Sequence, residues 1–286
     1  MENHLKKVLH HLYINPLEKC NLACKICYTR KTSPILSEEK ILSFIARYQK
    51  EYELKIITFC GGEVFTLSYF PDLVNSLTAQ GIFIQIITNG TVDTLDSFIH
   101  PNLINVIVSV DGVEKYHDSN RGVGNFRKSI SFIKKARLLG FHSEVFSIVT
   151  KQNYPQIDEF ESSLTKEVGP IEVTYHPRKP PMYLLHHPIS NIQGEVNGFD
   201  YLEKSDLIRL MKTHTVFPPL DLGCYQIAVA STGIIYGCCE GFMPLGKISD
   251  PIKTLFLALQ KRIGGPCKGC SQPEFMCGIR DVLSVS

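Results

Sequence analysis

Short runs of Ile, Val, Phe and Tyr alternate with amphipathic segments through the first two thirds of this chain of 286 residues. Runs of about four to eight such residues, bounded by polar or turn-forming residues, are typical of buried β-strands. The sequence has six runs of this kind, at 11–16, 55–60, 83–88, 105–110, 143–150 and 171–176. Strands that alternate with helices predict a parallel sheet whose connections are right-handed.

The segments between these runs carry apolar residues at three- and four-residue spacing, as amphipathic helices do. The first has Ile41, Ile45 and Tyr48 on one face, and Ser37 stands where a hydroxyl can cap the first turn. We expect the helices to cover the outer face of the sheet, although an open doubly wound sheet is an alternative. In either fold, ligands bind at the carboxyl ends of the strands.

The alternation stops after residue 176. Residues 177–200 contain four prolines and predict a long loop, for which a substrate lid is one interpretation. A helix is expected at 202–213. The remaining residues are rich in Cys, Gly and Pro and too few to bury much core, so a metal is expected to stabilise them. The sequence therefore predicts a core at 1–176, a linker or lid with a helix at 177–213 and a small metal-containing module at 214–286.

Charge and hydropathy argue against two classes of partner. The 30 Lys and Arg nearly balance the 28 Asp and Glu, giving a formal charge of +2, so no nucleic acid is expected. The longest apolar stretches, at 82–88 and 103–110, are far shorter than the ~20 residues of a transmembrane helix. The N-terminus lacks the apolar core and cleavage site of a secretion signal. We therefore expect a cytoplasmic protein without a membrane segment.

Ten cysteines in a reducing compartment are expected to be metal ligands, catalytic groups or small core residues rather than disulfides. Cys20, Cys24 and Cys27 follow the first predicted strand with the spacing CxxxCxxC. Three thiolates this close can bind one soft metal centre. Because a structural zinc site needs four ligands, three favour an iron–sulfur cluster with one open iron. Zinc with a distant fourth ligand is the alternative.

The CxxxCxxC loop resembles the signature of the radical S-adenosylmethionine (SAM) enzymes. Three further motifs follow successive predicted strands in the order of that family: Gly61, Gly62 and Glu63 as GGE, Thr88, Asn89 and Gly90 as TNG, and Ser109, Asp111 and Gly112 as SxDG. The resemblance covers residues 8 to about 176. It implies a partial (β/α)6 barrel of parallel strands.

The resemblance also implies roles for these residues. In the family, the open iron binds the amino and carboxylate groups of SAM, the GGE backbone binds the amino group, and SxDG binds the ribose. The implied cofactor-binding residues are Gly61, Gly62, Glu63, Asn89, Ser109, Asp111 and Arg121, with Cys20, Cys24 and Cys27 on a 4Fe–4S cluster. The alternative interpretation of Arg121 is an ordinary arginine on the protein surface. Ile26 replaces the aromatic residue usual before the third cysteine, and Cys60 is expected to be a small buried residue.

Six cysteines lie in the last 63 residues, enough for one fully ligated cubane. Cys224 and Cys238 flank a predicted hairpin with Gly233 at its turn, and Cys267 and Cys270 form a CxxC. This pattern resembles the auxiliary-cluster module of the family, called SPASM with two clusters and Twitch with one. No further CxxxC follows, which favours the Twitch form with Cys224, Cys238, Cys267 and Cys270 as ligands. Cys239 or Cys277 could replace one of them, and a zinc ribbon is the alternative.

The resemblance implies that a flavodoxin or ferredoxin reduces the first cluster, and that SAM is cleaved to a 5′-deoxyadenosyl radical that abstracts a substrate hydrogen. A second 4Fe–4S cluster could accept the substrate's electron, which would make the reaction an oxidation or a crosslink. A ribosomally made peptide is the favoured substrate, although no peptide-binding domain is expected before the first strand. A sugar or nucleotide-derived small molecule is one alternative. A non-catalytic zinc-binding module is another.

Overall fold

The computed structural model describes residues 10–27, 29, 31–178, 196–216, 227–237 and 244–263. Six parallel strands lie at the six predicted runs: β1 His11–Ile14, β2 Ile56–Phe59, β3 Phe83–Thr88, β4 Ile104–Ser109, β5 His142–Val149 and β6 Glu172–Pro177. The α-helices that connect them are α2 Glu38–Gln49, α3 Phe70–Thr78, α4 Glu114–Arg121, α5 Asn125–Leu138 and α6 Ile157–Val168. Short 3₁₀ helices occur at η1 Val64–Thr66, η2 Leu95–Ser97, η3 Pro101–Leu103 and η4 Tyr154–Gln156.

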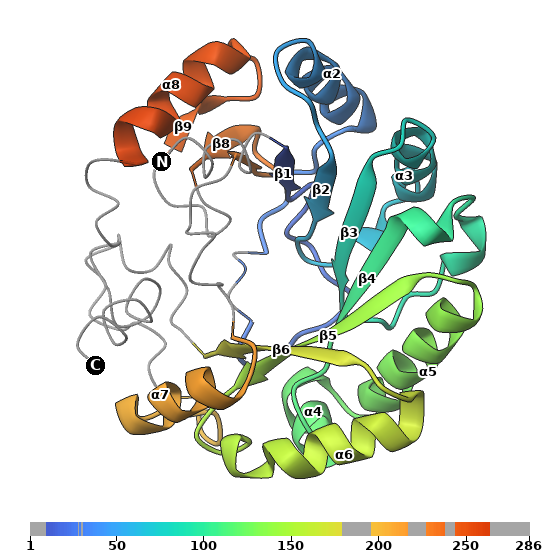
Figure 1. Cartoon of the computed structure of the whole chain (residues 1–286), viewed down its shortest axis with the longest axis vertical. Coiled ribbons are helices and arrows are strands. Elements are labelled where there is room, and N and C mark those ends of the chain that lie inside the picture. The colour runs from blue at the N-terminus through green and yellow to red at the C-terminus, as the bar shows by residue number, and fades with distance from the viewer. Residues whose placement is uncertain are drawn as a thin grey trace.

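The order of the strands decides between the two folds that the sequence allowed. From β6 to β1 the strands follow one another in sequence order, and every neighbouring pair is parallel. A doubly wound sheet reverses its order at a switch point among such strands, and β1 to β6 show no reversal. Figure 1 shows the strands round an arc with α2, α3, α5 and α6 on its outer side. The fold is therefore the partial barrel of parallel strands.

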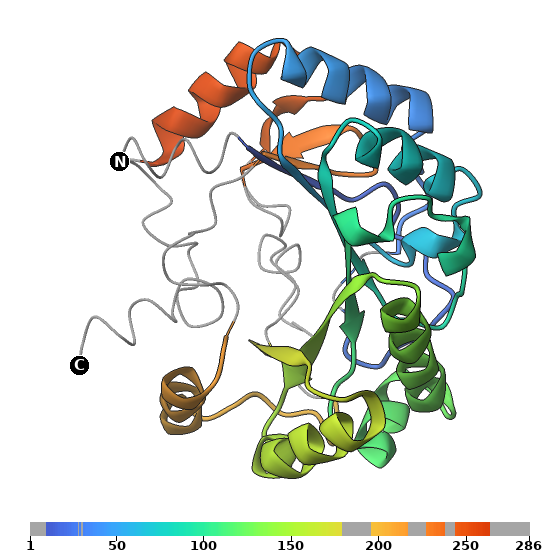
Figure 2. The same cartoon turned by 45° about the vertical axis from the view of Figure 1, so that its right-hand side comes forward.

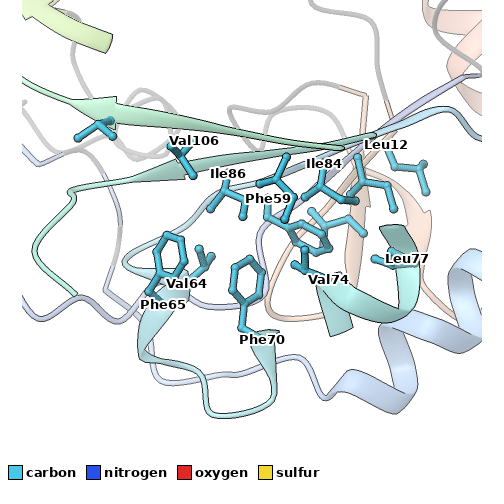
Figure 3. Close-up of a cluster of buried hydrophobic side chains, with 14 of the residues drawn as sticks. Leu12, Phe59, Val64, Phe65, Phe70, Val74, Leu77, Ile84, Ile86 and Val106 are labelled. Carbon is cyan, nitrogen blue, oxygen red and sulfur yellow. The ribbon is translucent and has the colours of Figure 1, made fainter. Parts of the chain in front are cut away.

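The core lies between the outer face of the sheet and the helices. Figure 3 shows Leu12, Phe59, Ile84 and Val106 projecting from four strands towards apolar side chains of η1 and α3. Phe59 meets Phe70 edge to face, with ring centroids 5.3 Å apart. Edge-to-face contacts add to the stabilisation from apolar burial. This packing fixes the strands, and with them the loops at their carboxyl ends.

The inner face of the same strands is more polar. In β1, Leu12 and Ile14 are buried whereas His11 and Tyr13 are partly exposed, as strand alternation requires. His11 Nε2 lies 2.8 Å from the hydroxyl of Thr58, which in turn donates to Gln85 at 2.7 Å. The concave side therefore carries hydrogen-bonding groups rather than a closed apolar core.

The predicted helix at 202–213 is present as α7, Lys204–Thr213, and the predicted hairpin is present as β7 Ile227–Val229 and β8 Ile234–Tyr236. Gly233, in its turn, has a φ of 79°, which only glycine adopts freely. The sequence did not indicate that β7 pairs parallel to β1 and that β9, Pro244–Lys247, and α8, Ile252–Ile263, follow it. The sheet of the barrel thus continues into the region predicted as a separate module.

Helix α8 packs beside α2, as Figure 2 shows. Arg47 of α2 donates to the backbone carbonyls of Ile248, Ser249 and Asp250 in the turn before α8. Tyr52 also meets Phe256, with ring centroids 5.3 Å apart.

Among the residues described here, no helix combines the length and the apolar character needed to cross a membrane.

Candidate active site

The loop after β1 carries Cys20, Cys24 and Cys27, all free thiols of intermediate burial. Burial raises the pKa of Cys20 and Cys24, and the neighbouring thiols act in the same direction. In the described part of the chain, no three His, Cys, Asp or Glu side chains converge closely enough to hold a single ion. Thiolates are soft ligands, suited to zinc or to an iron–sulfur cluster, and coordination would deprotonate them.

The glycines of the GGE turn allow a close approach to the cysteine loop. A β-carbon on Gly61 would lie 2.2 Å from the carbonyl oxygen of Leu17, and one on Gly62 would lie 1.8 Å from that of Lys19. These carbonyls accept hydrogen bonds of 3.0 Å from the N–H groups of Gly62 and Glu63. The loops after β1 and β2 are therefore joined backbone to backbone, immediately before Cys20.

Glu63 is completely buried, and its carboxylate is engaged by the protein. It accepts from the hydroxyl of Thr88 at 2.8 Å and from the N–H groups of Asn89 and Phe65 at 2.8 and 3.2 Å. Burial raises the pKa of Glu63 to about 7, although these three donors favour the ionised form. The resemblance implied that Glu63 is a cofactor-binding residue, and in the structure its carboxylate braces the GGE turn against the end of β3.

Asn89 reaches from the end of β3 to the cysteine loop. Its side-chain amide donates to Asn21 Oδ1 at 2.9 Å and lies 3.6 Å from the sulfur of Cys20. Its amide oxygen accepts from the N–H and hydroxyl of Thr91. The TNG motif thus contacts the loop that carries the candidate metal ligands.

Asp111 and Arg121 form a buried ion pair. The guanidinium makes two bonds to the carboxylate, at 2.6 and 3.0 Å, and the exposed fraction is 0% for the Asp111 side chain and 11% for that of Arg121. Burial by itself would raise the pKa of Asp111, but Arg121 holds it below its usual value. Arg121 is therefore not the surface arginine of the alternative interpretation. Ser109 ends β4 on the same side, partly exposed.

Two further residues complete this corner and were not predicted. Asn120, directly before Arg121, bonds both Asp111 and the cysteine loop. Asn153 donates to the backbone carbonyl of Asp111 at 2.6 Å. Both are buried amides with no motif around them, so only their low exposure in the fold distinguishes them from ordinary loop residues.

The residues present fit the two cofactors that the sequence suggested. The cysteines offer soft ligands, the glycines let the cysteine loop lie against the end of β2, and a buried charged pair stands at the end of β4. Cys60 is partly exposed rather than buried and bonds the hydroxyl of Tyr13. The candidate auxiliary ligands Cys224, Cys238, Cys267 and Cys270 lie outside the described residues.

Fold and site together define a class: a partial barrel of parallel strands with a three-cysteine cofactor loop at their carboxyl ends. Residues 14–164, more than half of the chain, match the family model of the Radical SAM superfamily, and the chain belongs to this family. Membership implies a 4Fe–4S cluster and SAM as cofactors. It thereby favours iron over zinc at the first cysteine cluster.

Curated relatives match about half of the chain. The mycofactocin maturase MftC of Mycolicibacterium smegmatis is 26% identical over 163 residues, which are 54% of this chain and 41% of that protein. The sporulation killing factor maturation protein SkfB of Bacillus subtilis is 27% identical over 148 residues, 49% of this chain and 36% of SkfB. The 7-carboxy-7-deazaguanine synthase of Aquifex aeolicus is 29% identical over 119 residues, 41% of this chain and 53% of the synthase. The chain thus spans about half or less of these relatives.

Solved structures extend the similarity of fold to nearly the whole chain. Native anSMEcpe with bound AdoMet has a TM-score of 0.72 at 20% identity, covering 94% of this chain and 88% of that one. Streptococcus suis SuiB bound to precursor peptide SuiA has a TM-score of 0.71 at 15% identity, covering 94% and 70%. At these identities the likeness concerns the fold.

Proposed function

We propose that Cys20, Cys24 and Cys27 hold a 4Fe–4S cluster, and that SAM binds beside it against the backbone of Gly61 and Gly62. The observation that carries this proposal is the joining of the cysteine loop to the GGE turn by backbone hydrogen bonds that leave no room for a β-carbon. Glycine at both positions lets the main chain of the cysteine loop approach the GGE turn this closely. Both turns lie at the carboxyl ends of parallel strands, where ligands of such sheets bind.

The remaining candidate residues orient SAM in this proposal. Asn89 and Glu63 hold the turns after β2 and β3, Ser109 offers a hydroxyl, and the fully buried Asp111 holds the partly accessible guanidinium of Arg121 in place for the ribose and carboxylate. A buried ion pair with bidentate geometry is held in one orientation, which suits a positioning role. These residues contribute binding and orientation, while the cofactors carry the difficult chemistry.

A cluster held by Cys20, Cys24 and Cys27 and reduced by a flavodoxin or ferredoxin would supply, together with SAM, the radical chemistry that removes a substrate hydrogen. The chain's part is to place the substrate against SAM and to keep water away.

The test of this assignment compares two cysteine variants of the full chain, reconstituted without oxygen and reduced with dithionite. Cys24→Ala removes one of three proposed ligands and is expected to abolish 5′-deoxyadenosine formation. Cys60→Ala is the matched control, because Cys60 is a nearby cysteine that the proposal leaves outside the cluster. Unchanged 5′-deoxyadenosine formation by Cys24→Ala would refute the assignment.

We propose a ribosomally made peptide as substrate, modified by oxidation or crosslinking. Support comes from MftC and SkfB, both named as maturation proteins, and from the fold shared with SuiB, which is solved with its precursor peptide. A nucleotide-derived or other small molecule is the second candidate, since a deazaguanine synthase also matches. Deuterated candidate substrates distinguish them: deuterium should appear in 5′-deoxyadenosine with a peptide, and its appearance only with a small molecule would refute the peptide.

We also propose an auxiliary 4Fe–4S cluster on Cys224, Cys238, Cys267 and Cys270, and a division into 1–176, 177–213 and 214–286 in which β7 joins the last part to the sheet of the first. Two cubanes should give about eight irons per chain, and one should give about four. Cys270→Ala should spare uncoupled SAM cleavage and stop product formation. Wild-type turnover in that variant would show that the second cluster is not needed.

A further inference from the structure

Asn120 joins the cysteine loop to the end of β4. It lies at the penultimate position of α4 and is 2% exposed. Its side-chain amide donates to Asp111 Oδ2 at 2.7 Å, and its amide oxygen accepts from the N–H of Ile26 at 3.2 Å. Its backbone carbonyl accepts from the N–H of Lys25 at 3.1 Å. Ile26 and Lys25 lie between Cys24 and Cys27, so three bonds from one residue reach both sides of the site.

The two partners fix the orientation of the amide. An ionised carboxylate such as Asp111 only accepts, and a backbone N–H such as that of Ile26 only donates. The partners therefore require a donor and an acceptor about one amide width apart, which asparagine supplies. Aspartate would keep the acceptor but place a second carboxylate against Asp111, and alanine would lose both bonds.

We propose that Asn120 is a positioning residue that fixes the cysteine loop relative to Asp111, so that one SAM molecule can reach the cluster and the ribose site together. This inference rests on the proposed function. Because SAM would have to bridge the two parts, a change in their separation should weaken SAM binding while leaving all three cysteine ligands in place. Replacing a buried asparagine that has no such partners should not weaken SAM binding in this way.

The test compares Asn120→Ala and Asn120→Asp with Asn125→Ala in the full chain. Asn125 is the matched control: it is also buried, and its side chain donates to the carbonyl of Arg121 at 2.7 Å without touching the cysteine loop. Three quantities are measured: iron content after anaerobic reconstitution, the SAM dissociation constant, and the hydrogen exchange of the Ile26 amide in the protein without SAM.

We expect wild-type iron content in both Asn120 variants and SAM binding weaker by roughly tenfold or more, as for loss of a bond to a charged group. The Ile26 amide should exchange faster in Asn120→Ala, and Asn120→Asp should retain its protection because the acceptor remains. Asn125→Ala should match wild type in iron content and SAM affinity.

The inference is overturned if both Asn120 variants bind SAM within twofold of wild type. It is also overturned if iron content falls in parallel with SAM affinity, or if the control loses SAM affinity equally, since either result indicates a general structural role. Failure of the proposed function is distinguishable: the wild-type protein would then not bind SAM, while Ile26 exchange would still report on the link itself.

Discussion

Gly62→Ala tests whether backbone contact between two loops holds the cofactor site. A β-carbon at this position would lie 1.8 Å from the carbonyl oxygen and 2.2 Å from the carbonyl carbon of Lys19. Real β-carbons stay at least 3.0 Å from such atoms, so the loops must separate by 3.0 − 1.8 = 1.2 Å or more. The obstacle is main chain on both sides, so no side-chain rotation can relieve it.

The displacement would fall on Lys19, which directly precedes Cys20. A misplacement of about 1 Å at a catalytic site can cost on the order of a hundredfold in rate. We therefore expect Gly62→Ala to lose at least this factor in 5′-deoxyadenosine formation. Overpacking should also lower the free energy of unfolding by about 1–3 kcal/mol.

The assay follows 5′-deoxyadenosine by chromatography after anaerobic reconstitution, with iron content and thermal unfolding measured on the same samples. Gly81→Ala is the control, because Gly81 has a φ of 78° and a β-carbon there would meet no heavy atom within 4 Å. That change should cost roughly 1–2 kcal/mol of backbone strain and leave SAM cleavage intact. Wild-type cleavage by Gly62→Ala, or equal losses in both variants, would refute the reasoning.

Three further predictions concern buried charge, pH and packing. Arg121→Met leaves Asp111 buried without its partner and should lower the free energy of unfolding by about 3–5 kcal/mol in denaturant titrations, whereas an unchanged midpoint would contradict the ion pair's importance. Burial lowers the pKa of His117 from 6.5 to about 4, so the unfolded chain takes up the proton at a higher pH than the folded protein does. The free energy of unfolding should therefore fall as the pH drops from 6.5 towards 4. His117→Asn should reduce this pH dependence when unfolding is measured across that range. Arg47→Met removes the bonds to the turn before α8 and should speed hydrogen exchange in α8 without changing SAM cleavage, and unaltered exchange would argue against this anchor.

The fold was largely predictable because its information is local. Each strand is a short apolar run, and α2 begins where Ser37 accepts from the N–H of Lys40, as the sequence suggested. The strand order was not predictable from these patterns, because an amphipathic helix has the same sequence in a barrel and in a doubly wound sheet. The pairing of β7 with β1 was equally hidden, since the three-residue register Leu12 to Ile227 joins segments more than 200 residues apart.

The sequence motifs of the candidate site were predictable, but the hydrogen-bond and ion-pair partners of its side chains were not. The cysteine spacing and the GGE, TNG and SxDG turns could be read directly, since each occupies a few consecutive residues. The partners of the acidic side chains could not be read from the sequence: Glu63 is held by Thr88 and Asn89, and Asp111 is held by Arg121. Burial decides such partners, because a buried carboxylate must be paired or hydrogen-bonded, and the fold determines which donors are within reach.

These internal partners imply a site that is largely organised before any cofactor binds. The cysteine loop is tied to the end of β2 through Lys19, to the end of β3 through the bond from Asn89 to Asn21, and to the end of β4 through Asn120. Each tie uses groups of the chain itself, so none depends on iron or SAM. A binding site held in place in advance loses less entropy when its ligand arrives. Because of these hydrogen bonds, a displacement of any one of the three strand ends also displaces the loop that carries the proposed cluster.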